Sequence, residues 1–286
     1  MPEADRTAVV FPGQGSQTDD MRAAAQAVRP DLVALAEEVV GEDPFARVDE
    51  GTRFQQPAIF CASLAGFNTL DVTPAAAAGH SLGEFSALAA AGAIDEDDAL
   101  RLVALRGRVM DAAAQEGPPG GMLAVLKGEP GQAEAIARAA DVVVANDNAP
   151  GQIVLSGPVE ALDAAAVAAE RDGLRAMRLP VSGSFHSPAM EPATDQLRAA
   201  LRGVEVRRPR FPVLSSIFAR PFGHVRLELA LALTHPVRWR QTLLALRDAG
   251  IRRFVETGPG KVVTGLVRRT LPDVEAVAAE PERARA

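Results

Sequence analysis

Short apolar runs alternate with helix-length segments along most of this chain. Thr7 to Phe11 is β-branched and apolar and ends at Pro12-Gly13, which predicts a buried strand closed by a turn. A small-residue run at 74–79 predicts a second strand and 82–91 a helix. Further helical patterns lie at 18–29, 31–40, 56–70 and 95–114. Because strands and helices alternate, and Ala, Val and Leu outnumber aromatic residues, an α/β fold is favoured.

The middle of the chain has a different order of elements. Residues 115–121 are rich in Gly and Pro and are interpreted as a linker. Strands are expected behind it at 122–127, 142–145, 152–156 and 174–181, with helices at 131–140 and 159–172. The order β-α-β-β-α-β is that of a ferredoxin-like unit. We therefore expect a large α/β domain, 1–119 and 187–286, with a small inserted domain at 120–186.

After the insertion, strands and helices alternate again. Helices are expected at 189–202, 226–233, 239–249 and after 260, with strands at 211–217 and 253–256. Residues 279–286 have no periodicity and are expected to form a loose tail.

Composition and charge exclude several classes of protein. The 286 residues are 48% apolar with a net charge of −7, which disfavours nucleic acid as a ligand. No run is long enough to span a membrane and no signal peptide pattern begins the chain, so a cytoplasmic protein is expected. The single Cys61 can form no internal disulfide and is interpreted as a buried small hydrophobe. No motif has metal-ligand spacing, so no metal is expected.

A candidate nucleophile stands between the second strand and its helix. Gly79-His80-Ser81-Leu82-Gly83 fits G-x-S-x-G, which holds a serine on a sharp strand-to-helix turn. The helix N-terminus behind Ser81 offers backbone N–H groups to a developing oxyanion. The alternative is a helix-capping serine without chemistry.

A serine nucleophile needs a base, and the chain has four histidines. His80 neighbours Ser81 on the turn and should point away from it, while His224 lies in a loop flanked by Pro and Gly and His235 precedes Pro236. His186 lies on a polar loop at the seam between the expected domains, a common position for active-site residues. We therefore favour His186 as the base over a loop histidine that is only hydrogen-bonded.

Two further features are unusual. Residues 11–17, Phe-Pro-Gly-Gln-Gly-Ser-Gln, allow close backbone approach to a ligand but lack the third glycine of a dinucleotide fingerprint. Arg106 lies on the apolar stripe of the 95–114 helix, where a charge needs an anionic partner. That partner is either a ligand carboxylate or an internal acid such as Glu84 or Asp111.

With these residues together, the chain strongly resembles the malonyl-CoA:acyl carrier protein transacylases and the acyltransferase domains of polyketide synthases. The resemblance runs from about Val9 to about Arg269. The matching motifs, in the family's order, are FPGQGSQ (11–17), GHSLGEFSAL (79–88), LRG with Arg106, NDNAPGQIVLSG (146–157), GSFHSPAM (183–190), HPVRW (235–239) and ETGPGKVVTGL (256–266).

The resemblance implies a fold and roles for individual residues. It implies a hydrolase-like, doubly wound, mostly parallel sheet with an inserted ferredoxin-like α+β subdomain. Ser81 would be the nucleophile and His186 the base, oriented by a backbone carbonyl from segment 235–238. Arg106 would bind the malonyl carboxylate. The backbone N–H groups of Gln14 and Leu82 would form the oxyanion hole.

The implied reaction is ping-pong acyl transfer. Malonyl-CoA acylates Ser81, and the phosphopantetheine thiol of an acyl carrier protein then takes the malonyl group. No cofactor is required, and a monomer that binds neither nucleic acid nor membrane is expected. Phe185, beside His186, is expected to exclude a methyl branch on the acyl group. Basic residues are expected to dock the acidic carrier, with Arg207, Arg208, Arg210 and Lys261 as candidates.

Three other functions stay open at this point. An α/β-hydrolase-type esterase shares the serine turn but normally carries an acid between Ser and His. The malonyl transferase subunit of malonate decarboxylase would use the same site. A silent thioester-binding module would not need Ser81, His186 and Arg106 together.

Overall fold

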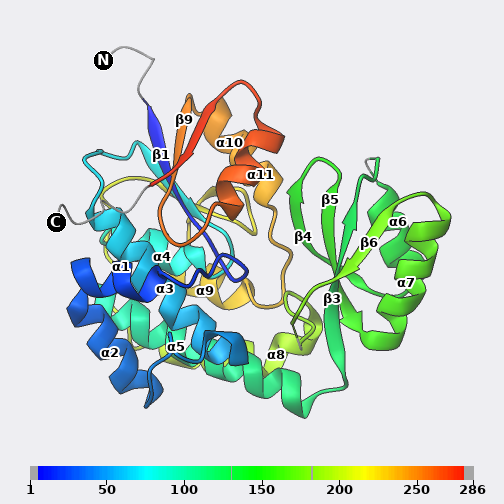
Figure 1. Ribbon diagram of the computed structural model, residues 1–286, viewed down its shortest axis with the longest axis horizontal. Helices are drawn as coiled ribbons and strands as arrows, with labels where there is room; N and C mark the ends of the chain where they lie inside the picture. Colours follow the sequence, from blue (N-terminus) through cyan, green and yellow to red (C-terminus); the bar gives the residue numbers. More distant parts are fainter. Residues whose placement is uncertain (1–5, 130, 182, 280–286) are drawn as a thin grey trace.

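The computed structural model describes residues 6–129, 131–181 and 183–279, and its larger part is a three-layer α/β domain (Figure 1). The sheet has the order β10-β9-β1-β2-β7-β8 and is parallel except for β8. Its strands are β1 (Thr7–Phe11), β2 (Ala76–Gly79), β7 (Val213–Ser215), β8 (Arg220–Pro221), β9 (Arg253–Glu256) and β10 (Glu275–Ala278). This architecture confirms the expected mostly parallel sheet.

Helices cover both faces of this sheet. One group comprises α1 (Met21–Val28), α2 (Pro30–Val40), α3 (Thr52–Asn68), α4 (Gly83–Ala90), α5 (Glu96–Glu116), α8 (Glu191–Leu201) and α9 (Val225–Leu231). The other comprises α10 (Trp239–Asp248) and α11 (Val262–Thr270). Short 3-10 helices lie at Val48–Glu50 and Pro188–Met190.

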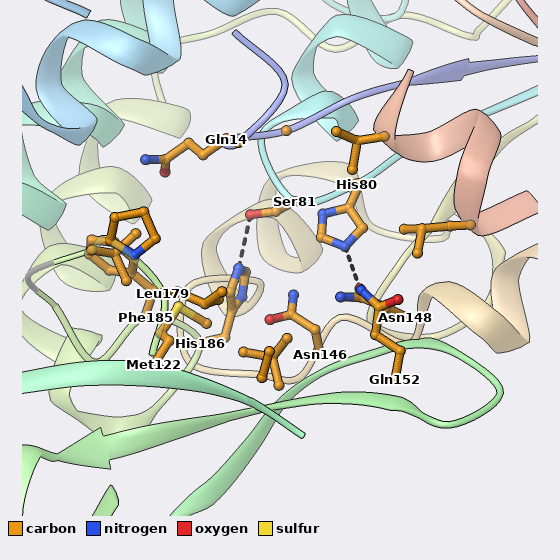
Figure 2. Close-up of a pocket in the computed structure, with 18 of the residues that line it drawn as sticks. Gln14, His80, Ser81, Met122, Asn146, Asn148, Gln152, Leu179, Phe185 and His186 are labelled. Atoms are coloured by element: carbon orange, nitrogen blue, oxygen red, sulfur yellow. Dashed lines mark hydrogen bonds between the residues drawn. The ribbon is translucent and has the colours of Figure 1, made fainter. Parts of the chain in front are cut away.

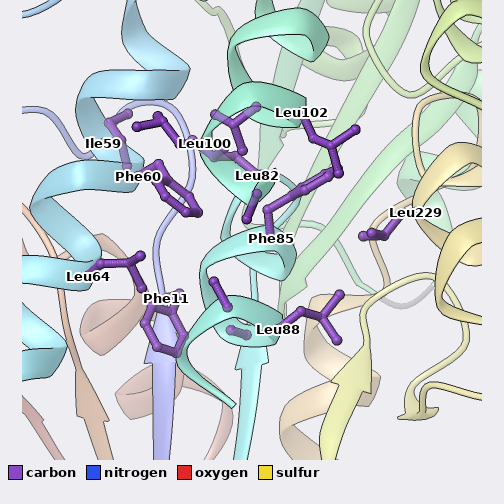
Figure 3. Close-up of a cluster of buried hydrophobic side chains, with 14 of the residues drawn as sticks. Phe11, Ile59, Phe60, Leu64, Leu82, Phe85, Leu88, Leu100, Leu102 and Leu229 are labelled. Carbon is purple, nitrogen blue, oxygen red and sulfur yellow. The ribbon is translucent and has the colours of Figure 1, made fainter. Parts of the chain in front are cut away.

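Alternate residues of β1 serve the two cores. Val9 and Phe11 pack in the core with α1 to α5, whereas Ala8 and Val10 pack in the core with α10 and α11. This two-residue period follows from the opposite directions of successive side chains in a strand. Figure 3 shows the first core, in which Phe85 lies beside Leu82. The phenylalanine ring has no polar atom, so its burial requires no hydrogen-bond partner.

The inserted part has a four-stranded antiparallel sheet in the order β4-β5-β3-β6. Its elements are β3 (Gly120–Leu126), α6 (Gln132–Ala139), β4 (Val143–Ala149), β5 (Gln152–Pro158), α7 (Val159–Arg171) and β6 (Arg175–Arg178). Counted within the unit, the strand order is 2-3-1-4, which is the ferredoxin-like arrangement. Leu123 and Val125 face α6 and α7, while Met122, Ala124 and Leu126 face the large domain.

Two contacts attach the small sheet to the large domain. Val237 pairs with β4 like a strand, since its N–H donates to Ala145 O and its carbonyl accepts from Asp147 N, each at 2.8 Å. The Asp147 carboxylate accepts hydrogen bonds from the side chains of Arg240 and Gln241 in α10. These contacts place the apolar face of the small sheet over the carboxyl ends of β1 and β2.

The differences from the expected elements lie at edges and ends. The edge strands β8 and β10 were not predicted, and β4 extends to Ala149 where an end at Ala145 was expected. Helix α3 begins at Thr52 rather than at residue 56. Cys61 is fully buried, and burial raises the pKa of its thiol, as expected for an inert cysteine. Residues 280–286 of the predicted tail lie outside the described residues. Among the described residues, no helix is long and apolar enough to span a membrane.

Candidate functional site

Ser81 occupies a sharp turn between β2 and α4. Its φ is 52°, in the left-handed region that non-glycine residues rarely adopt, so the turn is strained. The glycines on either side are required for space. A Cβ on Gly79 would lie 1.8 Å from the backbone of Gly83, and a Cβ on Gly83 would lie 2.3 Å from Phe11 O. The sequence therefore folds into the strand-turn-helix that G-x-S-x-G predicted.

His186 lies against Ser81. Its Nε2 is 2.9 Å from Ser81 Oγ, a hydrogen-bond distance, although 105 residues separate the two in the chain (Figure 2). His186 also has a positive φ, 56°. Two strained residues that meet through their side chains are typical of a catalytic pair.

Backbone carbonyls hold the other nitrogen of His186. Nδ1 is 2.8 Å from Ala232 O and 3.2 Å from His235 O. The expected segment, 235–238, thus supplies the longer contact, and the shorter one comes from Ala232 at the end of α9. The prediction was incomplete because a carbonyl gives no signal in the sequence. Both carbonyls require a proton on Nδ1, which leaves the Nε2 lone pair for Ser81.

His186 is kept neutral by its surroundings. Burial and the guanidinium of Arg106 lower the pKa of His186 to about 3, against the opposing effect of the carbonyl of Ala232. A neutral imidazole is the form that accepts a proton from a serine hydroxyl.

Arg106 projects from α5 to the same point and is 1% exposed. Its Nη2 donates to Ser81 Oγ at 2.9 Å and its Nη1 donates to Gln56 Oε1 at 2.6 Å. Burial lowers the pKa of Arg106 to about 10, a value at which the side chain is still charged at neutral pH.

The internal ion pair considered for Arg106 does not form within the described residues. Glu84 instead accepts a hydrogen bond from Ser216 N at 2.6 Å, and burial raises the pKa of its carboxyl to about 7. Asp111 accepts from Gln115 at 3.0 Å. The guanidinium therefore keeps its capacity to bind a carboxylate.

Gln14 and Leu82 present the backbone donors expected of an oxyanion hole. In the described part of the chain, neither backbone N–H has a protein acceptor. The side chain of Gln14 is fixed by Thr52, which donates to its Oε1 at 2.9 Å, and by Gln55, which accepts from its Nε2 at 2.7 Å. Donors that are fixed in advance can stabilise a developing negative charge.

Ser81, His186 and Gln14 line a pocket of about 490 Å³ between the two sheets, and the buried Arg106 reaches it through its contact with Ser81 Oγ. Large-domain residues, including Ser81 and Gln14, line one side, and Phe185 lies beside His186. The small sheet covers the other side with apolar residues and with the polar side chains of Asn146, Asn148 and Gln152. An apolar pocket with a few convergent polar groups is typical of a ligand site.

The sequence analysis did not identify every residue that contacts the site, and it left one histidine without a role. His80 points away from Ser81 as expected, and its Nε2 lies 2.8 Å from Asn148 Oδ1 in the small domain. Gln56 was not singled out, although a glutamine on a buried helix is a signal of a polar partner. No group of His, Cys, Asp and Glu in the described ranges could hold a metal ion.

Three comparisons place this geometry in a family. Residues 8–282 match the family model of the acyl transferase domain. The chain belongs to this acyl transferase family. Members with similar sequences include the malonyl CoA-acyl carrier protein transacylases of Escherichia coli, 37% identical over 95% of this chain and 94% of the relative, and of Haemophilus influenzae, 36% identical over 94% of each.

Polyketide proteins are also among the relatives of this acyltransferase. The polyketide biosynthesis protein ThaF of Burkholderia thailandensis is 40% identical over 93% of this chain, which spans only 24% of ThaF. The solved malonyl-CoA:acyl carrier protein transacylase of Xanthomonas oryzae superposes with a TM-score of 0.90 at 38% identity, covering 98% and 96% of the chains. A malonyl-transacylase solved in complex with its type II polyketide acyl carrier protein gives 0.87 at 37% identity, covering 96% and 95%.

Proposed function

We propose that this acyltransferase moves a malonyl group from malonyl-CoA to the phosphopantetheine thiol of an acyl carrier protein. The observation that carries the proposal is the pair of contacts at Ser81 Oγ, which His186 and Arg106 both reach at 2.9 Å. A base and a carboxylate-binding cation therefore lie at one nucleophile. The relatives named above as malonyl transacylases support the same substrate.

The geometry supports a role for each group in the proposed first transfer. Ser81 Oγ attacks the thioester carbonyl while its proton passes to His186 Nε2. The carbonyl oxygen becomes an oxyanion near the N–H groups of Gln14 and Leu82. The imidazolium then protonates the departing thiolate of coenzyme A, and the malonyl group remains on Ser81 as an ester.

The second transfer reverses these roles. His186 takes the proton of the carrier thiol, the thiolate attacks the malonyl ester, and Ser81 leaves with the proton. Guanidinium forms two parallel hydrogen bonds with a carboxylate, so Arg106 would fix the malonyl tail and aim its carbonyl at Ser81.

The alternatives fit the site less well. An esterase of the α/β-hydrolase type orients its histidine with an acid, whereas His186 Nδ1 meets the carbonyls of Ala232 and His235. A silent binding module has no need of the contact between His186 and Ser81. The transacylase relatives favour transfer to a carrier protein over a role in malonate decarboxylase.

Transfer is tested with malonyl-CoA, this enzyme and a holo acyl carrier protein. The mass of the carrier should increase by one malonyl group, and only when the enzyme is present. Formation of free malonate at the same rate, with no carrier product, would assign the protein to the hydrolases.

The two-domain division and the monomeric state remain predictions. The proposed boundaries, 120 and 187, are supported by the start of β3 at Gly120 and by a separate apolar core between the small sheet and α6 and α7. We propose a cytoplasmic monomer that acts on neither nucleic acid nor membranes, in keeping with the net charge of −7.

The selectivity of Phe185 can be measured as a substrate ratio. Its ring lines the pocket beside His186 and is 6% exposed. Phe185→Ala should raise methylmalonyl transfer relative to malonyl transfer by about 10- to 200-fold, the range that one methyl group controls. Phe218→Ala, at an aromatic residue that is 37% exposed, is the matched control. An unchanged ratio in Phe185→Ala would remove this role.

The candidate carrier-docking residues lie in two separate regions of the large domain, one near the end of α4 and one at the start of α11. Arg210 donates to Ala90 O at the end of α4 opposite to Ser81, and Arg207 and Arg208 precede it. Lys261 instead directly precedes α11, whose Val262 and Arg269 line the pocket. We therefore propose Lys261 and Arg269 as the basic rim for the carrier.

Charge reversal tests this rim. Lys261→Glu should raise the KM for an acidic carrier severalfold, while the KM for malonyl-CoA stays within about twofold. Arg269→Glu, at a residue that lines the pocket, should raise both KM values. Arg208→Glu is the matched control, since it makes the same charge change at a distance from the site. Equal effects of Arg208→Glu and the rim variants would reject the proposed rim.

A further inference from the structure

Two groups form hydrogen bonds with Ser81 Oγ and have opposite effects on the electron density of this oxygen. Its hydroxyl donates to His186 Nε2, which raises the electron density on the oxygen. The same oxygen accepts a charged hydrogen bond from Arg106 Nη2, which lowers it. Nucleophilic attack uses a lone pair of that oxygen, so the bond from Arg106 opposes the reaction that His186 promotes.

The other contacts of the Arg106 guanidinium allow its Nη2 and Nε atoms to bind a better acceptor than Ser81 Oγ. Nη1 is anchored by Gln56 at 2.6 Å, whereas Nε has no partner among the described residues. A neutral hydroxyl is a weak acceptor for a guanidinium, and a carboxylate is a strong one. Arg106 itself does not line the pocket, so a carboxylate that binds it must come up to Ser81 and would compete with Ser81 Oγ for Nη2.

We propose that Arg106 caps Ser81 until the carboxylate of the incoming acyl group takes the guanidinium away. This inference rests on the proposed malonyl transfer and adds a second source of selectivity to it. A malonyl group would bring its own means of uncapping the nucleophile. An acetyl group would meet a serine that is still capped, so it would react slowly even when bound.

The chemistry of attack requires the cap to leave. As Oγ bonds to the acyl carbon, it becomes an ester oxygen, which accepts hydrogen bonds poorly. The bond from Arg106 must therefore break on the way to the acyl-enzyme. Losing one charged hydrogen bond corresponds to about tenfold or more in rate.

His186 should respond to the same change. The charged and titratable groups that face it are Arg106 from α5 and His80 from the serine turn, and the loop after α9 contributes the carbonyls of Ala232 and His235. Arg106 lowers the pKa of His186. A carboxylate that neutralises Arg106 would raise that pKa and make the imidazole a stronger base.

A neutral alkyl fluorophosphonate tests the cap without any malonyl chemistry. In its reaction the Ser81 Oγ–P bond forms, the P–F bond breaks, fluoride leaves and the serine proton passes to His186. Arg106→Ala and Arg106→Gln should be phosphonylated about tenfold faster than the wild type. Arg208→Ala should react at the wild-type rate, and circular dichroism melts verify that each protein is folded.

The pH profile of the same reaction gives a second readout. Removing the positive charge of Arg106 should move the acid limb of phosphonylation to higher pH, because the pKa of His186 rises. A role confined to packing would leave the limb in place. Rates in the variants that are equal to or below the wild-type rate, or an unmoved acid limb, would overturn the cap.

A wild-type measurement covers the case of a variant that does not fold. A probe with a carboxymethyl arm should show a higher maximal rate at saturation than its propyl analogue. If only the half-saturating concentration differs, Arg106 binds carboxylates but does not cap Ser81, and the inference fails. Faster phosphonylation of Arg106→Gln together with no malonyl adduct on the wild type would retain the cap and reject the proposed substrate.

Discussion

His186→Ala is expected to slow the acylation of Ser81 by malonyl-CoA by about 10²- to 10⁴-fold, the usual contribution of a positioned base. His186 Nε2 lies 2.9 Å from Ser81 Oγ, and carbonyl contacts fix the proton on Nδ1. Without the imidazole, water must take the serine proton. The measurement is the rate of acyl-enzyme formation by quench and intact-protein mass.

The matched control for this variant is His224→Ala, because His224 is exposed at the start of α9. It should acylate at the wild-type rate. A wild-type rate in His186→Ala would place the base elsewhere.

The pH dependence of acylation follows from the lowered pKa of His186. The imidazole is active when neutral, so acylation falls only as the pH drops toward the folded pKa of about 3. The wild-type acid limb should therefore lie well below 6.5, the ordinary pKa of a histidine.

Arg106→Ala is expected to lower malonyl transfer by about a hundredfold or more, while acetyl transfer holds or rises. The malonyl carboxylate would lose its only buried cation in the described site, whereas an acetyl group has nothing for Arg106 to bind. The kcat/KM values for malonyl-CoA and acetyl-CoA, measured side by side, give the ratio.

Arg106→Lys keeps the charge and loses the two-pronged geometry of guanidinium. It should recover little malonyl transfer, because an ammonium cannot form the same pair of parallel hydrogen bonds. If malonyl and acetyl transfer decline together in Arg106→Ala while the protein stays folded, the arginine is architectural and the malonyl assignment loses its main physical support.

The parts of the fold that the sequence predicts well are those set by local chemistry. The strand Thr7–Phe11 is apolar throughout and ends at Pro-Gly, and both its ends were predicted correctly. The G-x-S-x-G turn is equally local, since Gly79 and Gly83 are needed wherever this turn occurs. The edge strand β8 is two residues long, exposed and contains a proline, so it has no strand pattern.

The parts of the site that the sequence does not predict depend on long-range packing. The carbonyl of Ala232 holds His186 only because α9 ends beside the loop that carries the histidine. Asn148 meets His80 only because the small sheet lies over the serine turn. The sequence could not decide whether Arg106 binds a ligand carboxylate or an internal acid. The structure favours the ligand, because Glu84 accepts a hydrogen bond from the backbone of Ser216 instead.

Malonyl transfer through Ser81 is tested by the intact mass of the protein after mixing with malonyl-CoA and no acceptor. Because His186 and Arg106 both contact Ser81 Oγ, we expect one stable malonyl adduct, located by peptide mapping at Ser81 and lost in Ser81→Ala. Water must be excluded from the ester for the adduct to persist. An unmodified wild type, or an adduct that forms equally in Ser81→Ala, would exclude Ser81 as the malonyl-carrying nucleophile.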